Sequence, residues 1–162
     1  TVIMEGSRPL VAEIQTLASE SSFAYPKRAG IGLGANKIGM LLAVLQSRCA
    51  LPSLRDDIYC NVAGGLEIHD PGADLALAAS MASALTGKNV LSECCLIDEV
   101  GLAGEVRPVS GLAQRLREAA RLGFKRAVVS SREEKPQLDA EIELIRVLSV
   151  SEALARANVV EP

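Results

Sequence analysis

The stretch that decides the fold of this sequence is Asp98-Glu99-Val100-Gly101-Leu102-Ala103-Gly104-Glu105-Val106-Arg107-Pro108-Val109-Ser110-Gly111-Leu112. The glycines near its centre predict a tight turn between two strands, over residues 94–98 and 105–109. The segment that follows, 111–122, carries apolar residues at helical spacing and predicts an amphipathic helix with Arg115 among its outward residues. The stretch therefore predicts a strand, a turn, a second strand and a helix in immediate succession.

A second informative stretch lies upstream, at Asp70-Pro71-Gly72-Ala73-Asp74-Leu75-Ala76. It leads into a segment rich in alanine and serine that ends at Ala84-Leu85-Thr86-Gly87. This segment predicts a helix over 73–85. Small side chains allow other elements to approach a helix closely, so we expect this helix to be central and buried.

The other expected elements follow from hydrophobic periodicity and turn residues. We expect strands over 1–5 and 10–17 around a turn at 6–9, a polar loop at 19–22, a strand over 27–33, a helix capped by Asn36 and ending at Arg48, strands over 57–62, 66–69, 127–130 and 142–147, and a closing helix capped by Ser151. Strands and helices do not alternate steadily, which favours an α+β fold over a doubly wound sheet.

Composition places the chain among folded globular proteins. It has 162 residues, of which 49% are hydrophobic and 2% aromatic, so we expect one domain, 1–162, with a core of Leu, Val, Ile and Ala. No apolar run reaches the length of a membrane span. The first residues resemble a strand rather than a signal peptide, and position 1 is not Met. We therefore expect a fragment of a longer, cytoplasmic protein.

The cysteines and the single histidine offer no metal pattern. Cys49, Cys60, Cys94 and Cys95 contain no C-x-x-C pair, and His69 has no partner at ligand spacing. We expect buried free thiols, with Cys94 and Cys95 on opposite faces of a strand. Residues 30–34 have a glycine rhythm but no complete nucleotide-binding motif, so we expect no cofactor in this chain.

Charge is distributed unevenly along the chain. The net charge is −3, but residues 107–132 hold seven basic residues and one acid. That local balance of +6 leaves −9 for the rest of the chain. Such clustering suits an anionic partner, although a solvated helix face would look the same in the sequence.

Both informative stretches resemble the catalytic segments of Lon-type proteases, which use a serine nucleophile and a lysine base. Alignment through Leu85-Thr86-Gly87 places Gly72 at the position of the serine. Alignment through Gly111-Leu112 places Ala113 at the position of the lysine. The resemblance therefore implies a Lon-like scaffold that has lost its catalytic pair.

The resemblance is most specific to the Lon-like C-terminal domain of the bacterial RadA (Sms) family. It extends over further blocks in the same order, at residues 5–15, 26–45, 99–109 and 119–127. The chain departs from the family at Asp98, where glycine is usual, at Gly34, where aspartate is frequent, and at Ser130-Ser131, which replaces a proline-containing run.

Membership of that family implies a fold of the ribosomal protein S5 domain 2-like type without peptidase activity. It also implies that the domain supports hexameric ring assembly and DNA binding during branch migration in DNA repair and recombination. The family joins this domain to a zinc module and a RecA-like ATPase. ATP, Mg and Zn are therefore expected in domains of the parent protein that this chain lacks.

The resemblance and the basic clusters together predict contacts with a nucleic-acid backbone. The expected DNA-binding residues are Arg8, Lys27, Arg28, Arg115, Arg117, Arg121, Lys125 and Arg126. Reading of individual bases is not expected, because the only aromatic residues are Phe23, Tyr25, Tyr59 and Phe124.

Two other functions remain open from the sequence. The first is an active Lon-type peptidase with relocated residues, for which Ser80, Ser83, Ser110, Lys88 and His69 are poor candidates because none has an evident partner. The second is a purely structural oligomerisation module, which is compatible with DNA binding because a ring repeats each weak contact.

Overall fold

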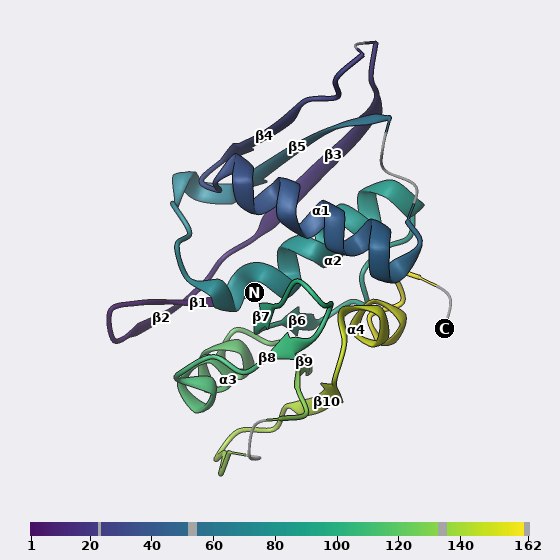
Figure 1. Cartoon of the computed structure of the whole chain (residues 1–162). Helices are drawn as coiled ribbons and strands as arrows, with labels where there is room; N and C mark the ends of the chain where they lie inside the picture. The colour runs from purple at the N-terminus through teal and green to yellow at the C-terminus, as the bar shows by residue number, and fades with distance from the viewer. Residues whose placement is uncertain (23, 52–54, 133–135, 161–162) are drawn as a thin grey trace.

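The computed structural model describes residues 1–22, 24–51, 55–132 and 136–160. Its elements, shown in Figure 1, are β1 (Val2–Glu5), β2 (Arg8–Val11), β3 (Ile14–Glu20), β4 (Arg28–Ile31), α1 (Ala35–Cys49), β5 (Asp56–Val62), the 3-10 turns η1 (Ala63–Gly65) and η2 (Pro71–Ala73), α2 (Asp74–Thr86), β6 (Cys94–Leu96), β7 (Glu99–Val100), β8 (Val106–Arg107), α3 (Leu112–Arg121), β9 (Arg126–Ser130), β10 (Glu143–Val147) and α4 (Val150–Arg156). This is a mixed α/β structure.

A three-stranded sheet of order β3-β5-β4 occupies the upper half of Figure 1. β3 pairs with β5 antiparallel, and β4 pairs with β5 parallel. Helices α1 and α2 pack against it, and Ile38 of α1 shares one apolar cluster with Ile58 and Cys60 of β5. The side chains that alternate with these on β5 point away from the helices.

A second, parallel sheet of order β10-β9-β6 lies in the lower half of the molecule. Its central strand is buried on both faces. Val128 joins the cluster that includes α4, whereas Ala127 and Val129 join the cluster that includes α3. Cys94 and Cys95 divide between the same two clusters, which confirms that they point to opposite faces.

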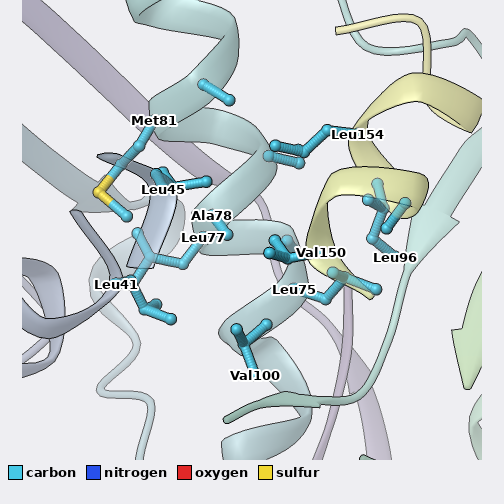
Figure 2. Close-up of a cluster of buried hydrophobic side chains, with 14 of the residues drawn as sticks. Leu41, Leu45, Leu75, Leu77, Ala78, Met81, Leu96, Val100, Val150 and Leu154 are labelled. Atoms are coloured by element: carbon cyan, nitrogen blue, oxygen red, sulfur yellow. The ribbon is translucent and has the colours of Figure 1, made fainter. Parts of the chain in front are cut away.

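Helix α2 runs through the main core, as its small residues predicted. Eight of its residues are buried, among them Leu75, Leu77, Ala78 and Met81. Figure 2 shows side chains of α1, α4, β6 and β7 around it. None of the helices in the described ranges is long and apolar enough to cross a membrane.

The expected strand over 10–17 is two strands. β2 ends at Val11 and pairs with β1, whereas β3 begins at Ile14 and pairs with β5 through Glu20. One continuous β-prone run thus serves two sheets, and the first half of the expected loop at 19–22, Ser19 and Glu20, belongs to β3. Residues 66–69 form no assigned strand; the main-chain N–H of Ile68 donates to Gly32 O at 2.8 Å.

Two helix starts also differ from the expectation. Helix α4 begins after Ser149, not after Ser151, and the Ser149 hydroxyl accepts from the Glu152 N–H at 3.2 Å. The Glu152 carboxylate accepts from the Leu148 N–H at 2.9 Å, so the side chains of Ser149 and Glu152 both accept from main-chain N–H groups at this helix start. Helix α1 begins after Gly34 without a side-chain cap, so Asn36 lies inside the helix.

All four cysteines are unpaired thiols. Cys60, Cys94 and Cys95 are buried, as expected, while Cys49 at the end of α1 is half-buried. Burial raises the pKa of Cys49 to about 11 and that of Cys95 to about 12, so both thiols are protonated at neutral pH.

Candidate functional site

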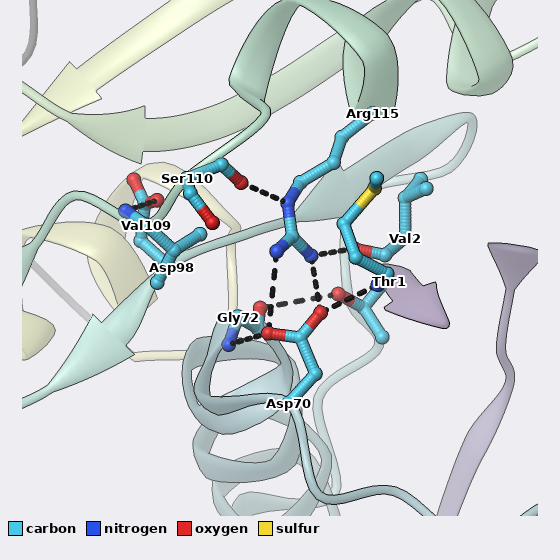
Figure 3. A network of polar contacts seen from close by, with 9 residues as sticks. Thr1, Val2, Asp70, Gly72, Asp98, Val109, Ser110 and Arg115 are labelled. Carbon is cyan, nitrogen blue, oxygen red and sulfur yellow. Dashed lines mark hydrogen bonds and ion pairs between the residues drawn. The ribbon is translucent and has the colours of Figure 1, made fainter. Parts of the chain in front are cut away.

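Gly72 lies in the η2 turn that leads directly into the core helix α2. The Asp70 side chain caps this turn by accepting from the Gly72 N–H at 2.8 Å. The Gly72 carbonyl accepts from the Asp98 N–H at 3.0 Å, which joins the two informative stretches of the sequence. The position expected for a nucleophile is therefore buried and held from both sides (Figure 3).

The guanidinium of Arg115 occupies the space in which a side chain at residue 72 would stand. A Cβ atom at Gly72 would lie 2.7 Å from Arg115 Nη1 and 3.0 Å from Asp70 Oδ1. Real Cβ atoms almost never approach another heavy atom so closely. A serine at position 72 therefore requires Arg115 or Asp70 to move.

Arg115 is 1% exposed, so the expectation that it points outward and contacts DNA is wrong. It comes from α3, where Leu112, Leu116 and Ala119 form the buried stripe. Because residues three and four apart share a helix face, Arg115 belongs to this stripe by its spacing from Leu112. The spacing of Arg115 from Leu112 could have indicated burial in the sequence. We expected the residue at the surface because basic side chains are seldom buried.

The buried guanidinium is well supplied with acceptors (Figure 3). Nη1 donates to Asp70 Oδ2 at 2.6 Å and to the Val2 carbonyl at 2.8 Å. Nη2 donates to Asp70 Oδ1 at 3.2 Å, and Nε donates to the Ser110 carbonyl at 3.0 Å. The ion pair with Asp70 is thus bidentate, and it joins β1, η2 and α3.

The environment of Asp70 favours its ionised form. Partial burial alone would raise the pKa of this carboxyl group, but hydrogen bonds from Arg115 and from the N–H groups of Met4 and Gly72 lower it below its ordinary value. Asp70 is therefore a carboxylate at neutral pH and serves as a structural counter-ion rather than as a proton carrier.

Asp98 is a second buried carboxylate next to this site. Its φ of 109° lies in a region that favours glycine, the residue that the family resemblance led us to expect there. The side chain compensates by accepting from the N–H groups of Val109 at 3.2 Å and Ser130 at 2.6 Å. Asp98 thereby holds the segment after β8 and the end of β9 next to η2.

Of the other candidate catalytic residues, Ala113 lacks a suitable side chain, two serines are engaged elsewhere, and Ser110 is exposed, with its carbonyl accepting from Arg115. Ala113, at the expected lysine position, is half-buried near the start of α3. Ser80 donates to the carbonyl of Ile14 at 3.2 Å and to the Thr16 hydroxyl at 2.8 Å, and Ser83 donates to the carbonyl of Lys88 at 2.7 Å. These are structural hydrogen bonds.

A cavity of about 410 Å³ adjoins the η2 turn, between α1 and α2. In it Lys37 Nζ lies 3.0 Å from Asp74 Oδ2, and the Asp74 side chain is only 4% exposed. Burial raises the pKa of Asp74, partly offset by Lys37. Asp74 lies in the first turn of α2, where a negative charge favours the helix dipole. His69, at the cavity rim, is 89% exposed and lies 3.8 Å from Glu67 Oε2.

Four of the expected DNA-binding residues lie on or just after α3. We call Arg117, Arg121, Lys125 and Arg126 the α3 surface. Its three arginines form ion pairs: Arg117 Nε with Asp139 at 3.1 Å, Arg121 Nη2 with Glu118 at 2.7 Å, and Arg126 Nε with Glu143 at 3.2 Å. Folding therefore brings acids from distant segments onto the basic stretch and cancels much of its charge.

The remaining expected DNA-binding residues lie elsewhere. Lys27 and Arg28 lie at the start of β4, in the half of the molecule opposite α3 (Figure 1). Arg28 donates to the carbonyl oxygens of Lys27 and Asp56. Arg8 faces Glu5 in the β1–β2 hairpin. The expected set thus does not form one surface. Of the four aromatic residues, Phe23 lies outside the described residues.

Residues 54–159 match the family model of the Lon protease (S16) C-terminal proteolytic domain. Three relatives are each called DNA repair protein RadA. The protein from Synechocystis is 43% identical over 100% of this chain and 31% of its own length. The Bacillus subtilis protein is 43% identical over 95% of this chain and 34% of its own length. The Escherichia coli protein is 38% identical over the same shares, 95% and 34%.

The chain spans about one third of the length of these relatives, in their C-terminal region. The matched family segment includes η2, α2, β7, β8 and α3, and thus both Gly72 and Ala113. The chain therefore belongs to the Lon protease C-terminal proteolytic domain family, and over its whole length it is similar to the C-terminal region of bacterial proteins named DNA repair protein RadA.

Proposed function

We propose that this chain is a catalytically inactive Lon-like domain of a RadA-type DNA repair protein, and that it assembles with copies of itself and contacts DNA. One observation carries the first part of the proposal. The Arg115–Asp70 ion pair fills the position at which a Lon-type nucleophile would stand beside Gly72.

Inactivity follows from the chemistry that such a site requires. Acyl transfer by a Ser/Lys pair needs a hydroxyl that can attack and a neutral amine that can accept its proton. Gly72 and Ala113 supply neither group. The basic side chain that is present, Arg115, is a guanidinium bound to Asp70 and offers no neutral amine to act as the general base.

DNA binding is proposed for the α3 surface, without Arg115. Its ion pairs lie at the surface, where Arg117 is 49% exposed and its partner Asp139 84% exposed. Such pairs contribute little to stability, so a phosphate oxygen can replace the carboxylate at small cost. Lys125 is exposed and makes no ion pair with the part of the chain that the structure describes. Its charge is therefore available to a backbone phosphate.

Assembly is the second half of the proposal, and a purely structural oligomerisation module is the competing function. The acids beside the α3 surface favour that competitor, because they reduce the attraction of one copy for DNA. In a ring of several copies, hexameric if the family pattern holds, weak contacts act together and avidity compensates for the low charge of each.

The wider expectations for the parent protein belong to the same proposal. They are a single S5 domain 2-like domain over 1–162, a cytoplasmic location, a role in branch migration, and ATP, Mg and Zn sites in other domains. The mixed α/β structure is consistent with the expected fold, and this chain spans 31% of the length of the Synechocystis relative, which leaves room for other domains. The remaining expectations rest on the family resemblance alone.

The DNA contact can be tested by measuring affinity for single-stranded DNA across a salt series. Replacing Arg121 and Lys125 with Ala removes two charges from the α3 surface. We expect weaker binding to all sequences and a salt slope that falls by about one unit per lost contact. The control variant replaces Arg55 and Arg156, which are exposed and lie outside this surface. An unchanged slope in the Arg121/Lys125 variant would restrict the domain to assembly.

A further inference from the structure

The segment that leads into β10 lies against α3, at the lower end of the molecule in Figure 1. Leu138 and Ile142 are half-buried there and pack on the apolar cluster that includes α3. Between them in the sequence, Asp139 Oδ1 accepts from Arg117 Nε at 3.1 Å. We call residues 138–142 the acidic strap, because Asp139 and Glu141 are its charged residues.

The acidic strap is anchored to the sheet at one end. Glu143, the first residue of β10, donates its main-chain N–H to Lys125 O at 2.9 Å and pairs in register with Arg126. Residues 136–142 belong to no helix or strand, and they make no main-chain to main-chain hydrogen bond with the described part of the chain. Two half-buried side chains and one exposed ion pair are thus the main contacts of the strap, and segments with so few contacts open at low cost.

The Asp139 carboxylate presents to Arg117 the same kind of acceptor that a DNA backbone presents. Hydrogen bonds from its own main-chain N–H and from Arg117 lower the pKa of Asp139, so its carboxyl group is charged at neutral pH. Carboxylate and phosphate oxygens both accept from a guanidinium. A phosphate that binds at Arg117 Nε must displace Asp139, and a phosphate that binds at the other nitrogens meets the repulsion of the neighbouring carboxylate. Asp139 therefore competes with DNA for Arg117.

We propose that the acidic strap is an autoinhibitory contact, which holds Arg117 when DNA is absent and leaves it when DNA binds. This inference rests on the DNA contact of the proposed function and adds an internal competitor for that contact. When a ligand binds only the open state of a protein, its measured affinity is reduced by the fraction of molecules that are open. Loosening the strap is therefore expected to strengthen DNA binding.

The test is the affinity for single-stranded DNA, measured by fluorescence anisotropy at low salt with three single variants. Asp139→Asn removes the competing charge, and Leu138→Ser weakens an apolar anchor without a change of charge. Glu141→Gln is the matched control, because Glu141 is an exposed acid of the same segment that forms no ion pair with the described residues. We expect the first two variants to bind about two- to fivefold more tightly, and the control to bind nearly like the parent. Circular dichroism establishes that all three are folded.

A double variant shows whether the gain depends on the partner of the strap. In an Arg117→Ala background the strap has no guanidinium to hold, so adding Asp139→Asn is expected to give no further gain in affinity. If Asp139→Asn and Leu138→Ser bind DNA like the parent, the strap is not autoinhibitory. An equal gain for Glu141→Gln and Asp139→Asn would also overturn the inference, because the effect would then be one of net charge alone.

The same measurements separate this inference from the proposed function. If replacing Arg121 and Lys125 weakens DNA binding while the strap variants bind like the parent, the DNA contact stands and the strap inference fails. If neither the parent nor the strap variants bind single-stranded DNA, the DNA contact and the strap inference both fail.

Discussion

The carboxylate of Asp70 and the guanidinium of Arg115, 45 residues apart in the chain, form a bidentate ion pair beside Gly72, the residue expected at the nucleophile position. The side chains of Arg115 and Asp70 are 2% and 10% exposed. The pair joins the first strand, the turn before the core helix and the amphipathic helix. The ion pair is thus a structural junction between these three segments.

Removal of one partner from this pair is expected to be strongly destabilising. In Asp70→Ala the guanidinium of Arg115 is left buried without a counter-ion, which costs about 3–5 kcal/mol of unfolding free energy. Urea denaturation measures this change. The exposed pair offers the control, because Asp139→Ala also removes the carboxylate partner of an arginine and is expected to leave the urea midpoint nearly unchanged. Equal effects of the two substitutions would contradict the assignment.

The pH dependence of stability has an expected sign for Asp70 and for Asp74. The pKa of Asp70 is lowered by folding, so its contribution is complete above the pKa of an unfolded Asp, about 3.9, and is lost as the pH falls through the folded value. Asp70→Asn has no carboxyl group to titrate, so we expect the unfolding free energy of this variant to depend less on pH in the acid range. The pKa of Asp74 is raised, so protonation of Asp74 favours the folded state as the pH falls, and Asp74→Asn removes that gain. Urea denaturation between pH 7 and 3 measures the unfolding free energy of both variants. The same change with pH in both variants would contradict these opposite signs.

A side chain at residue 72 is expected to destabilise the fold. The Cβ of Gly72→Ala would meet Arg115 Nη1 at 2.7 Å, and overpacking of this kind costs about 1–3 kcal/mol. Gly39→Ala is the matched control, because nothing lies within 4 Å of its Cβ and alanine favours the interior of α1 by up to about 1 kcal/mol. Thermal unfolding of the two variants should therefore shift in opposite directions. A stable Gly72→Ala variant would show that Arg115 moves easily.

The thiol of Cys49 is expected to react slowly in the native chain. Its pKa of about 11 against an ordinary 9.0 leaves about a hundredfold less thiolate at neutral pH. Alkylation by iodoacetamide, followed by mass spectrometry, should accelerate with pH up to the raised pKa. The urea-unfolded chain provides the reference, in which all four cysteines should react at the rate of a free thiol. Fast labelling of Cys49 in the folded chain would contradict its burial.

Local sequence signals predicted most of the elements but not how they pair. The buried helix α2 followed from its small apolar residues, and β9 followed from an apolar run. The break between β2 and β3 could not be predicted, because both strands have β-prone sequence and only their different partners separate them. The cap at Ser149 was missed because Ser151 offers the same side chain two residues later.

The candidate site was predictable in part. The resemblance located Gly72 and Ala113, but the role of Arg115 required the fold, since its partners lie in β1 and η2. The local charge balance predicted a more positive surface than the fold has. Asp139 and Glu143 lie beyond the basic stretch in the sequence, but in the fold they form ion pairs with Arg117 and Arg126. A cluster of like charges in a sequence predicts a charged surface only where folding brings no opposite charges from distant segments next to it.

The central claim is that the site holds a structural ion pair where a peptidase would hold its nucleophile. The most direct measurement is incubation of the folded chain with unfolded casein and with a serine-reactive phosphonate probe, beside an active Lon-type protease as the positive control. The account predicts intact casein and no labelled serine in this chain. Stoichiometric labelling of one serine, abolished when the chain is unfolded, would contradict it.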